Sequence, residues 1–257
     1  MKKIVLLSAC IVFSILSFAQ KIKKEEDKFY MLDENFKGTT QQQAKYFIRV
    51  ANLNDTCWQF DTYNITGPLI STEQYKDEQG KVMHGQSVYF NKKGTRDSIL
   101  HFANNFADGS WYYFNDTGKV FLQTDYVKGR LMATIDRIKK DSMDEIEYKK
   151  RDTSKTVEEE SSFQGGLKAW TKYLTDNMVY PDRAQKIEKQ GSVILQFIVD
   201  TEGRVVAPEI VQSVEFSLDE EAMRMIKGSP KWKPAFQNGK KVKSYKKQPI
   251  TFKLTSP

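Results

Sequence analysis

The chain has 257 residues, a formal net charge of +7, and 39% hydrophobic, 12% aromatic and 28% charged residues. This length leaves room for one large domain or two modest ones, and the composition is typical of a soluble, globular chain and not of a membrane bundle. Of its two cysteines, Cys10 lies in an N-terminal apolar run, so a chain that lost this run would keep Cys57 alone. A single cysteine excludes an intramolecular disulfide and a cysteine-based zinc site.

The first twenty residues have the pattern of an export signal. Two lysines precede an apolar run that ends in "SFAQ" (17–20). The run is slightly short for a transmembrane helix, so we expect residues 1–19 to be a signal peptide that is cleaved before Gln20. Two alternatives stay open: the run is retained as a membrane anchor, or Cys10 in "LSAC" is lipidated, as in a lipoprotein.

Residues 20–135 contain an internal repeat. An aromatic residue followed by Asn-x-x-Gly recurs at 63–67, 90–94 and 114–118, and another aromatic residue follows each glycine eight positions later. The asparagine favours a turn and the glycine a positive φ, so each unit predicts a β-hairpin, and stacked hairpins predict a mainly β domain. The copy "GSWYYFNDTGKV" (109–120) resembles the MORN-like repeats of the YwqK type, which imply a β-rich scaffold and say little about activity.

Residues 136–162 are charge-dense and poor in apolar residues, so we expect a linker before a second domain over 163–257. After a Gly-Gly entry, the spacing of Leu167, Trp170 and Leu174 predicts a helix that buries these three side chains.

Two further helices are expected in the second domain. Tyr180-Pro181 opens a short helix, with Ile187 turned inward. The segment "SLDEEAMRMIKG" predicts the main helix, with Ser217 and Glu220 as a capping box at its start.

Three strands complete the second domain. "GSVILQFIVD" (191–200) is apolar on both faces, which predicts a central strand. "RVVAPEIVQS" returns antiparallel to it, and Pro208 indicates that this return strand is an edge. A last strand is expected over about 242–254. The pattern therefore predicts an α+β domain.

The stretch "GSPKWKPAFQNGKKV" (228–242) connects the main helix to the last strand. Its prolines, including Pro234, prevent the helix from continuing, and Trp232 between them is expected to pack against the sheet. Asn238-Gly239 predicts a turn into the strand. The stretch is therefore a structural joint and not a chemical site.

The chain shows no pattern of catalytic or metal-binding residues. His84 and His101 have no triad or metal-ligand spacing around them, and the chain has no glycine-rich phosphate loop. Eight lysines and no acidic residue lie between 227 and 247, which could suit nucleic acid, but in an exported protein we favour a solvated face. We expect no enzyme activity, metal, cofactor or nucleic-acid partner.

The order of motifs from Phe163 to Leu254 is similar to that of the TonB C-terminal domain family. The matching motifs are Phe163 with Gly165-Gly166, Tyr180-Pro181, Gly191, Asp200 with Gly203, "LDEEAMR", "PKWKPAFQNGKKV" and "PITFKL". The resemblance implies a small α+β domain with a three-stranded antiparallel sheet and one main helix across it. Gln164, where the family often has proline, and Pro208 in the second strand depart from the family pattern.

The resemblance also implies a binding edge. In the energy transducers that give the family its name, the domain lies in the periplasm and binds the TonB-box peptide of outer-membrane transporters by adding it as an extra strand. Carried over to this sequence, the edge residues are Ser244, Tyr245, Lys246, Lys247 and Gln248. The two lysines favour an acidic partner or protect the edge from aggregation, and both interpretations stay open.

Taken with the export signal, the resemblance favours a non-enzymatic periplasmic protein that binds a peptide or protein partner at its edge strand, in connection with outer-membrane transport. If the N-terminal segment is retained, the protein is instead an inner-membrane-anchored energy transducer that works with an ExbB/ExbD-type motor, although a proline-rich spacer is missing among its seven prolines. A third alternative is a structural, envelope-binding protein that acts through its repeat domain. A homodimer formed by strand exchange also stays open.

Overall fold

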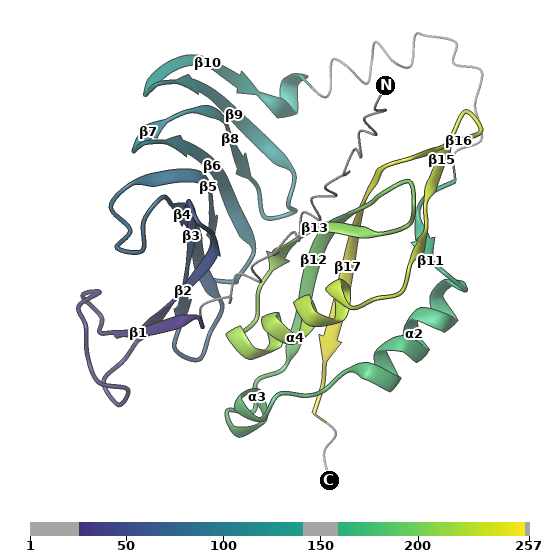
Figure 1. Ribbon diagram of the computed structural model, residues 1–257, viewed down its shortest axis with the longest axis horizontal. Helices are drawn as coiled ribbons and strands as arrows, with labels where there is room; N and C mark the ends of the chain where they lie inside the picture. The colour runs from purple at the N-terminus through teal and green to yellow at the C-terminus, as the bar shows by residue number, and fades with distance from the viewer. Residues whose placement is uncertain (1–25, 141–158, 255–257) are drawn as a thin grey trace, which may run out of the picture.

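The computed structural model describes residues 26–140 and 159–254, which form two parts that lie side by side (Figure 1). Residues 28–136 build one long antiparallel sheet, and residues 162–252 build an α+β part. The expected signal peptide (1–19) and most of the expected linker lie outside the described residues.

The N-terminal sheet is a stack of hairpins in chain order. The strands follow one another as β1-β2-β3-β4-β5-β6-β8-β9-β10, and β7 pairs with β6. They are β1 (Lys28–Leu32), β2 (Tyr46–Asn54), β3 (Cys57–Asn64), β4 (Leu69–Tyr75), β5 (Met83–Phe90), β6 (Arg96–Ala103), β7 (Phe106–Ala107), β8 (Gly109–Phe114), β9 (Val120–Val127) and β10 (Arg130–Asp136). The expectation of a mainly β domain of stacked hairpins is confirmed, whereas the MORN-like character of the repeats stays a prediction.

The Asn-x-x-Gly turns form as expected in two of the three repeats. In the second and third copies the asparagine carbonyl accepts a hydrogen bond from the N–H of Gly94 or Gly118, each at 2.8 Å, and both glycines have a positive φ. In the first copy the bond to Gly67 is longer, at 3.3 Å, and Gly67 does not take a positive φ. Pro68 follows directly and restricts the backbone of the residue before it, which explains why the expectation was wrong there.

The C-terminal part contains a three-stranded antiparallel sheet in the order β13-β12-β17, as the sequence predicts, and two small two-stranded sheets, β11-β14 and β15-β16. Its elements are β11 (Ser162–Phe163), α2 (Gly166–Asn177), α3 (Asp182–Lys186), β12 (Gly191–Val199), β13 (Val205–Gln212), α4 (Phe216–Lys227), β14 (Trp232–Lys233), β15 (Ala235–Gln237), β16 (Lys240–Val242) and β17 (Ser244–Phe252). Two details differ from the expectation. Helices α2 and α4 have 12 residues each, so there is no single main helix, and the expected last strand is β17, which is slightly shorter than predicted.

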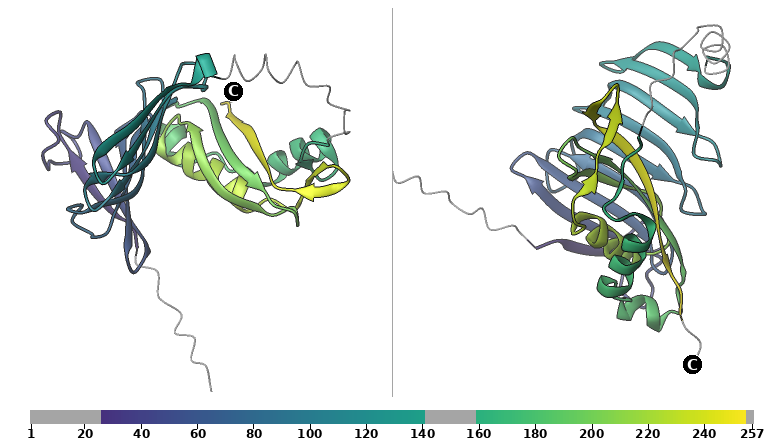
Figure 2. Two further views of the ribbon diagram at one scale, coloured as in Figure 1. Left: turned by 90° about the horizontal axis from the view of Figure 1, so that it is seen from above. Right: turned by 90° about the vertical axis from the view of Figure 1, so that its right-hand side faces the viewer.

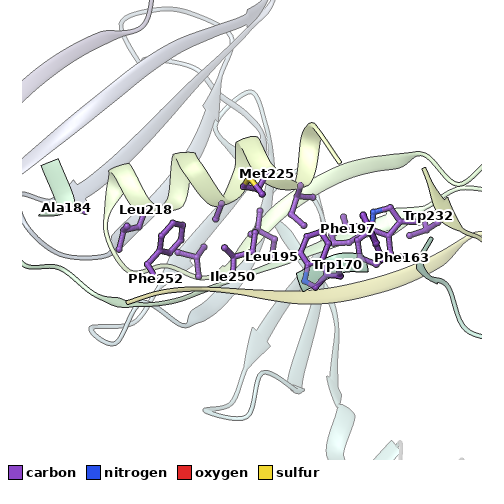
Figure 3. Packing of buried hydrophobic residues seen from close by; sticks show 14 residues of the cluster. Phe163, Trp170, Ala184, Leu195, Phe197, Leu218, Met225, Trp232, Ile250 and Phe252 are labelled. Atoms are coloured by element: carbon purple, nitrogen blue, oxygen red, sulfur yellow. The ribbon is translucent and has the colours of Figure 1, made fainter. Parts of the chain in front are cut away.

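The C-terminal core lies between one face of the three-stranded sheet and the helices (Figure 3). Alternate residues of β12 point into it, because side chains of a strand alternate between two faces. Helix α4 buries a stripe of side chains at helical spacing against this face. The residues of both elements are Val193, Leu195, Phe197 and Val199, with Leu218, Ala222, Met225 and Ile226. Each large aliphatic or aromatic side chain buried in this way stabilises the fold by about 1.5–3 kcal/mol.

Two expected core residues lie at the surface. Leu167 is 78% exposed and Ile187 is 36% exposed, whereas Trp170 is buried and Leu174 packs against the core. Spacing along a helix identifies its apolar face, but not how far along the helix the core extends.

The cap of α4 also differs from the expectation. Glu215 is the N-cap residue, and its carboxylate accepts hydrogen bonds from the backbone N–H and the hydroxyl of Ser217, at 2.8 and 2.6 Å. Ser217 is therefore already inside the helix, and Glu220 forms an ion pair with Arg49 instead of closing a capping box.

Candidate functional site

Strand β17 is an edge of the three-stranded sheet. Within the described residues it pairs with β12 alone, in a continuous antiparallel register from Ser244 opposite Val199 to Phe252 opposite Gly191. Residues with even numbers face the helices, and those with odd numbers lie on the open face of the sheet, where Tyr245 is 74% exposed. One side of the β17 backbone is thus without a partner strand in the part of the chain that the structure describes.

The side chains of the expected binding edge have different surroundings. The Ser244 hydroxyl donates to the Ser161 hydroxyl at 2.7 Å. Lys246 lies 3.6 Å from a carboxylate oxygen of the highly exposed Glu160, which makes a weak ion pair. Lys247 is exposed and forms no ion pair with another described residue. The edge therefore keeps positive charge on its open face.

The opposite edge of the sheet, at β13, is less available for a partner strand. Its end is held by the N-terminal sheet, because the N–H of Ser213 donates to the carbonyl of Gly94 at 2.8 Å. A Cβ atom on Gly94 would lie 2.3 Å from the carbonyl oxygen of Ser213, so this close approach requires glycine. Farther along, Ala207 takes a positive φ of 48° and Pro208 lacks an N–H. Strand β13 is an outer strand of its sheet, which confirms the expectation from Pro208, and its ladder with β12 has register shifts.

The stretch before β17 is a packed joint, as expected. Trp232 is 3% exposed, and its ring contacts those of Phe163, Trp170 and Phe197 at centroid distances of 5.1–5.6 Å (Figure 3). Pro234 separates β14 from β15.

The other sequence motifs of the domain also have structural roles. Asn238 and Gly239 form the turn of the β15-β16 hairpin, both with a positive φ. The Tyr180 hydroxyl donates to the carbonyl of Lys189 at 2.6 Å, and Pro181 is the N-cap residue of α3. These residues shape the domain and do not line the β17 edge.

A buried polar network joins the two parts. The carboxylate of Asp219, in the first turn of α4, accepts hydrogen bonds from the hydroxyls of Tyr63 (3.2 Å) and Ser213 (2.5 Å) and from the N–H of Val214 (3.0 Å). The Ser213 hydroxyl in turn accepts from the N–H of Leu69 at 2.8 Å. Burial raises the pKa of Asp219 to about 7 in spite of these donors.

Aromatic and ionic contacts flank this network. The Phe216 ring packs edge-on against three rings of the N-terminal sheet at centroid distances of 5.3–5.8 Å, namely Phe29, Phe47 and Tyr63. Arg49 lies over Phe216 and bridges Asp61 (2.6 Å) and Glu220 (2.8 Å). Helix α4 and the N-terminal sheet are therefore in direct contact, and the view from above in Figure 2 shows the helix beside this sheet.

A groove separates the rest of the N-terminal sheet from the open face of the C-terminal sheet. It has a volume of about 490 Å³, and one wall comes from β6, β8 and β9, the other from β12, β13 and β17. Tyr245 and Lys247 of the expected binding edge line this groove together with Tyr112 and Phe114 of the N-terminal sheet. The structure thus brings two residues of the expected edge against aromatic residues of the repeats, which the sequence did not connect.

Comparison with known protein families gives a match in the C-terminal part of the chain. Residues 176–254 match the family model of the Gram-negative bacterial TonB protein C-terminal. The C-terminal part of the chain is therefore similar to the TonB C-terminal domain family. The match begins at residue 176, so β11 and most of α2 lie before it. No curated protein matches the chain.

TonB C-terminal domains are periplasmic in Gram-negative bacteria, in agreement with the location expected from the sequence. None of the helices in the described residues is long and apolar enough to cross a membrane.

The histidines considered in the sequence analysis are not brought together with other ligating groups. His101 Nδ1 lies 3.0 Å from the carbonyl oxygen of Ser110, and His84 Nδ1 is buried without a hydrogen-bond partner among the described residues. Over those same residues, no group of three or more His, Cys, Asp or Glu side chains is arranged to hold a metal ion.

Proposed function

We propose that this protein is an exported, non-enzymatic member of the TonB family that binds an extended peptide by adding it as a strand to β17. The peptide belongs to an outer-membrane transporter and resembles a TonB box. The main support is the coincidence of the family match with an edge strand whose outer side has no partner strand in the described residues. Backbone hydrogen bonds of the edge supply affinity, and neighbouring side chains supply selectivity.

The surroundings of β17 favour this edge over the other. Strand β13 contains Pro208, two register shifts of its ladder with β12, and an end bound to the repeat domain. Strand β17 has a regular register over its nine residues, with a single proline at Pro249. The proline is expected to turn its nitrogen outward, because prolines in sheets are found where no ladder hydrogen bond is needed. Residues an even number of positions from Pro249, such as Lys247, point their N–H groups to the same side and offer them to the added strand.

Strand addition can be tested on the peptide, without altering the protein. A fluorescein-labelled peptide covering the TonB-box segment of a transporter from the same organism is made in two N-methylated forms, with the methyl groups on alternate residues in each. Removing amide donors that face β17 should abolish binding measured by anisotropy, whereas removing the alternate set should leave it within about threefold, since those amides face solvent. Equal effects of the two forms would contradict strand addition.

On the protein, Lys247→Pro and Lys247→Ala form a matched pair. Both remove the lysine side chain, but the proline also removes an outward N–H, so we expect loss of binding for Lys247→Pro and at most about a fivefold weakening for Lys247→Ala. If the two variants bind alike, the β17 backbone is not the site.

A further inference from the structure

The groove between the two parts continues the β17 edge. Its lining from the C-terminal sheet includes Ile198 of β12 and two of the open-face residues of β17, Tyr245 and Lys247. The Lys247 side chain extends to the turn between β8 and β9, because a Cβ atom on Gly118 would lie 3.8 Å from Lys247 Nζ. A strand added beside β17 places every second side chain on this same open face, at the mouth of the groove.

The wall formed by the repeat sheet is mainly apolar. Ile99 on β6, Tyr112 and Phe114 on β8 and Val120 on β9 line the groove. Paired positions explain why they share a face, since Ile99 lies opposite Tyr112, and Phe114 lies opposite Val120. Such a wall suits an aromatic or large aliphatic side chain.

The groove also holds an excess of positive charge. Arg96 is 5% exposed, and its Nε has no hydrogen-bond partner among the described residues. Its guanidinium lies 4.6 Å from the Phe114 ring centroid, and its Nη1 lies 3.4 Å from a carboxylate oxygen of Glu209, so that pairing is weak. With Lys247, the groove lining has two cations and one carboxylate. A buried guanidinium with an unused donor favours an added acceptor.

We propose that the groove selects the side chains of the peptide that adds to β17. An aromatic or large apolar side chain contacts Tyr245 and Tyr112, and an acidic side chain two residues away lies next to Lys247. The spacing of two follows from Tyr245 and Lys247, which are neighbours on one face of the strand. The repeat domain is then a specificity element for its own C-terminal domain. This inference rests on the proposed strand addition to β17.

The first test varies the peptide alone. Threonine-based octapeptides carry Phe and Glu two residues apart, in both orders, because the sense of the added strand decides which order fits. Matched peptides carry Ser in place of Phe, or Lys in place of Glu. For one of the two orders, we expect each replacement to weaken binding to the full chain by about two- to tenfold in an anisotropy titration.

The second test pairs groove variants with controls. Lys247→Glu should invert the preference between the Glu and Lys peptides, whereas Lys253→Glu, the same charge change just beyond β17, should not. Tyr112→Ser should remove the preference for Phe over Ser, whereas Tyr113→Ser, on the opposite face of β8, should keep it.

The outcomes separate this inference from the proposed function. Equal binding of all octapeptides would overturn the groove's role. Strand addition would stay in place if one of the two N-methylated forms of the transporter peptide still failed to bind. The groove's role is also overturned if the preferences exist but survive both groove substitutions. Binding of neither the octapeptides nor the transporter peptide would overturn both proposals.

Discussion

The hydroxyl of Tyr63, on β3 of the repeat sheet, donates a hydrogen bond of 3.2 Å to the carboxylate of Asp219 in α4. Both side chains are buried, and 156 positions of sequence separate them. The bond places the start of α4 directly on the repeat sheet. Because α4 also covers the C-terminal core, this contact fixes the position of β17 relative to the aromatic wall of the groove.

We expect the free energy of unfolding to depend on pH through Asp219. Burial raises its pKa to about 7, compared with an ordinary value of 3.8 in an unfolded chain. Between these values the folded protein holds a proton that the unfolded chain releases, so the free energy of unfolding decreases as the pH rises from about 4 to 7. The full shift corresponds to on the order of 4 kcal/mol. Urea denaturation followed by tryptophan fluorescence at several pH values measures this slope.

The variant Asp219→Asn removes the titrating group and should flatten this pH dependence. Asp182→Asn, which changes the acidic residue in the first turn of α3, serves as the control and should keep the slope of the wild type. A slope that is the same in Asp219→Asn and in the wild type would show that another group is responsible.

Two glycines with similar positive φ angles allow the stability cost of a strained backbone to be distinguished from that of a steric clash. Gly203 has a φ of 81°, and a Cβ atom there would lie 2.1 Å from the carbonyl oxygen of Trp232. Gly239 has a φ of 71°, but nothing lies within 4 Å of its added Cβ atom. Alanine at Gly239 should cost about 1 kcal/mol of stability through the left-handed backbone alone. Alanine at Gly203 should cost at least about 2 kcal/mol more, since Trp232 must move out of the core.

Denaturant unfolding of both alanine variants checks this difference. Equal losses in the two variants would mean that the joint around Trp232 adapts without cost, and that Gly203 is required for its φ alone.

The location of the protein can be checked from its N-terminus. We expect the chain isolated from its host to begin at Gln20, because the two lysines, the apolar run and "SFAQ" have the sequence pattern of a cleavable signal. Intact mass spectrometry measures this directly. A chain that keeps Met1 would favour the anchored energy transducer, and a lipid mass on Cys10 would identify a lipoprotein.

The sequence predicted most of the C-terminal fold because its signals are local. The spacing in α4, the alternation in β12, and the prolines around Trp232 all describe elements whose buried face can be read from a few neighbouring residues. The expectation failed where the outcome depended on distant parts of the chain. Leu167 has helical spacing but lies where the core ends.

The interface between the two parts could not be predicted from the sequence. Asp219 lies in the first turn of α4, where an acidic side chain is favourable at the helix N-terminus whether or not it has a distant partner. Its contact with Tyr63 depends on how a hairpin stack docks on an α+β domain, which no short pattern encodes. The same holds for Arg96 and the groove, since β6 and β17 line opposite walls of the groove only because the two parts dock. Phe216 is the one sequence feature that points to this interface, because a large aromatic side chain at the first residue of a helix needs a partner surface.

The most direct test of the central claim is a titration of the 15N-labelled mature chain with the transporter peptide, followed by backbone amide NMR. We predict that slowed hydrogen exchange and large shift changes appear at alternate amides of β17, with β13 unchanged and smaller changes at Tyr112 and Phe114 along the groove. Protection of amides on β13, or on the outer strands β1 and β10 of the repeat sheet, with β17 unaffected, would contradict it.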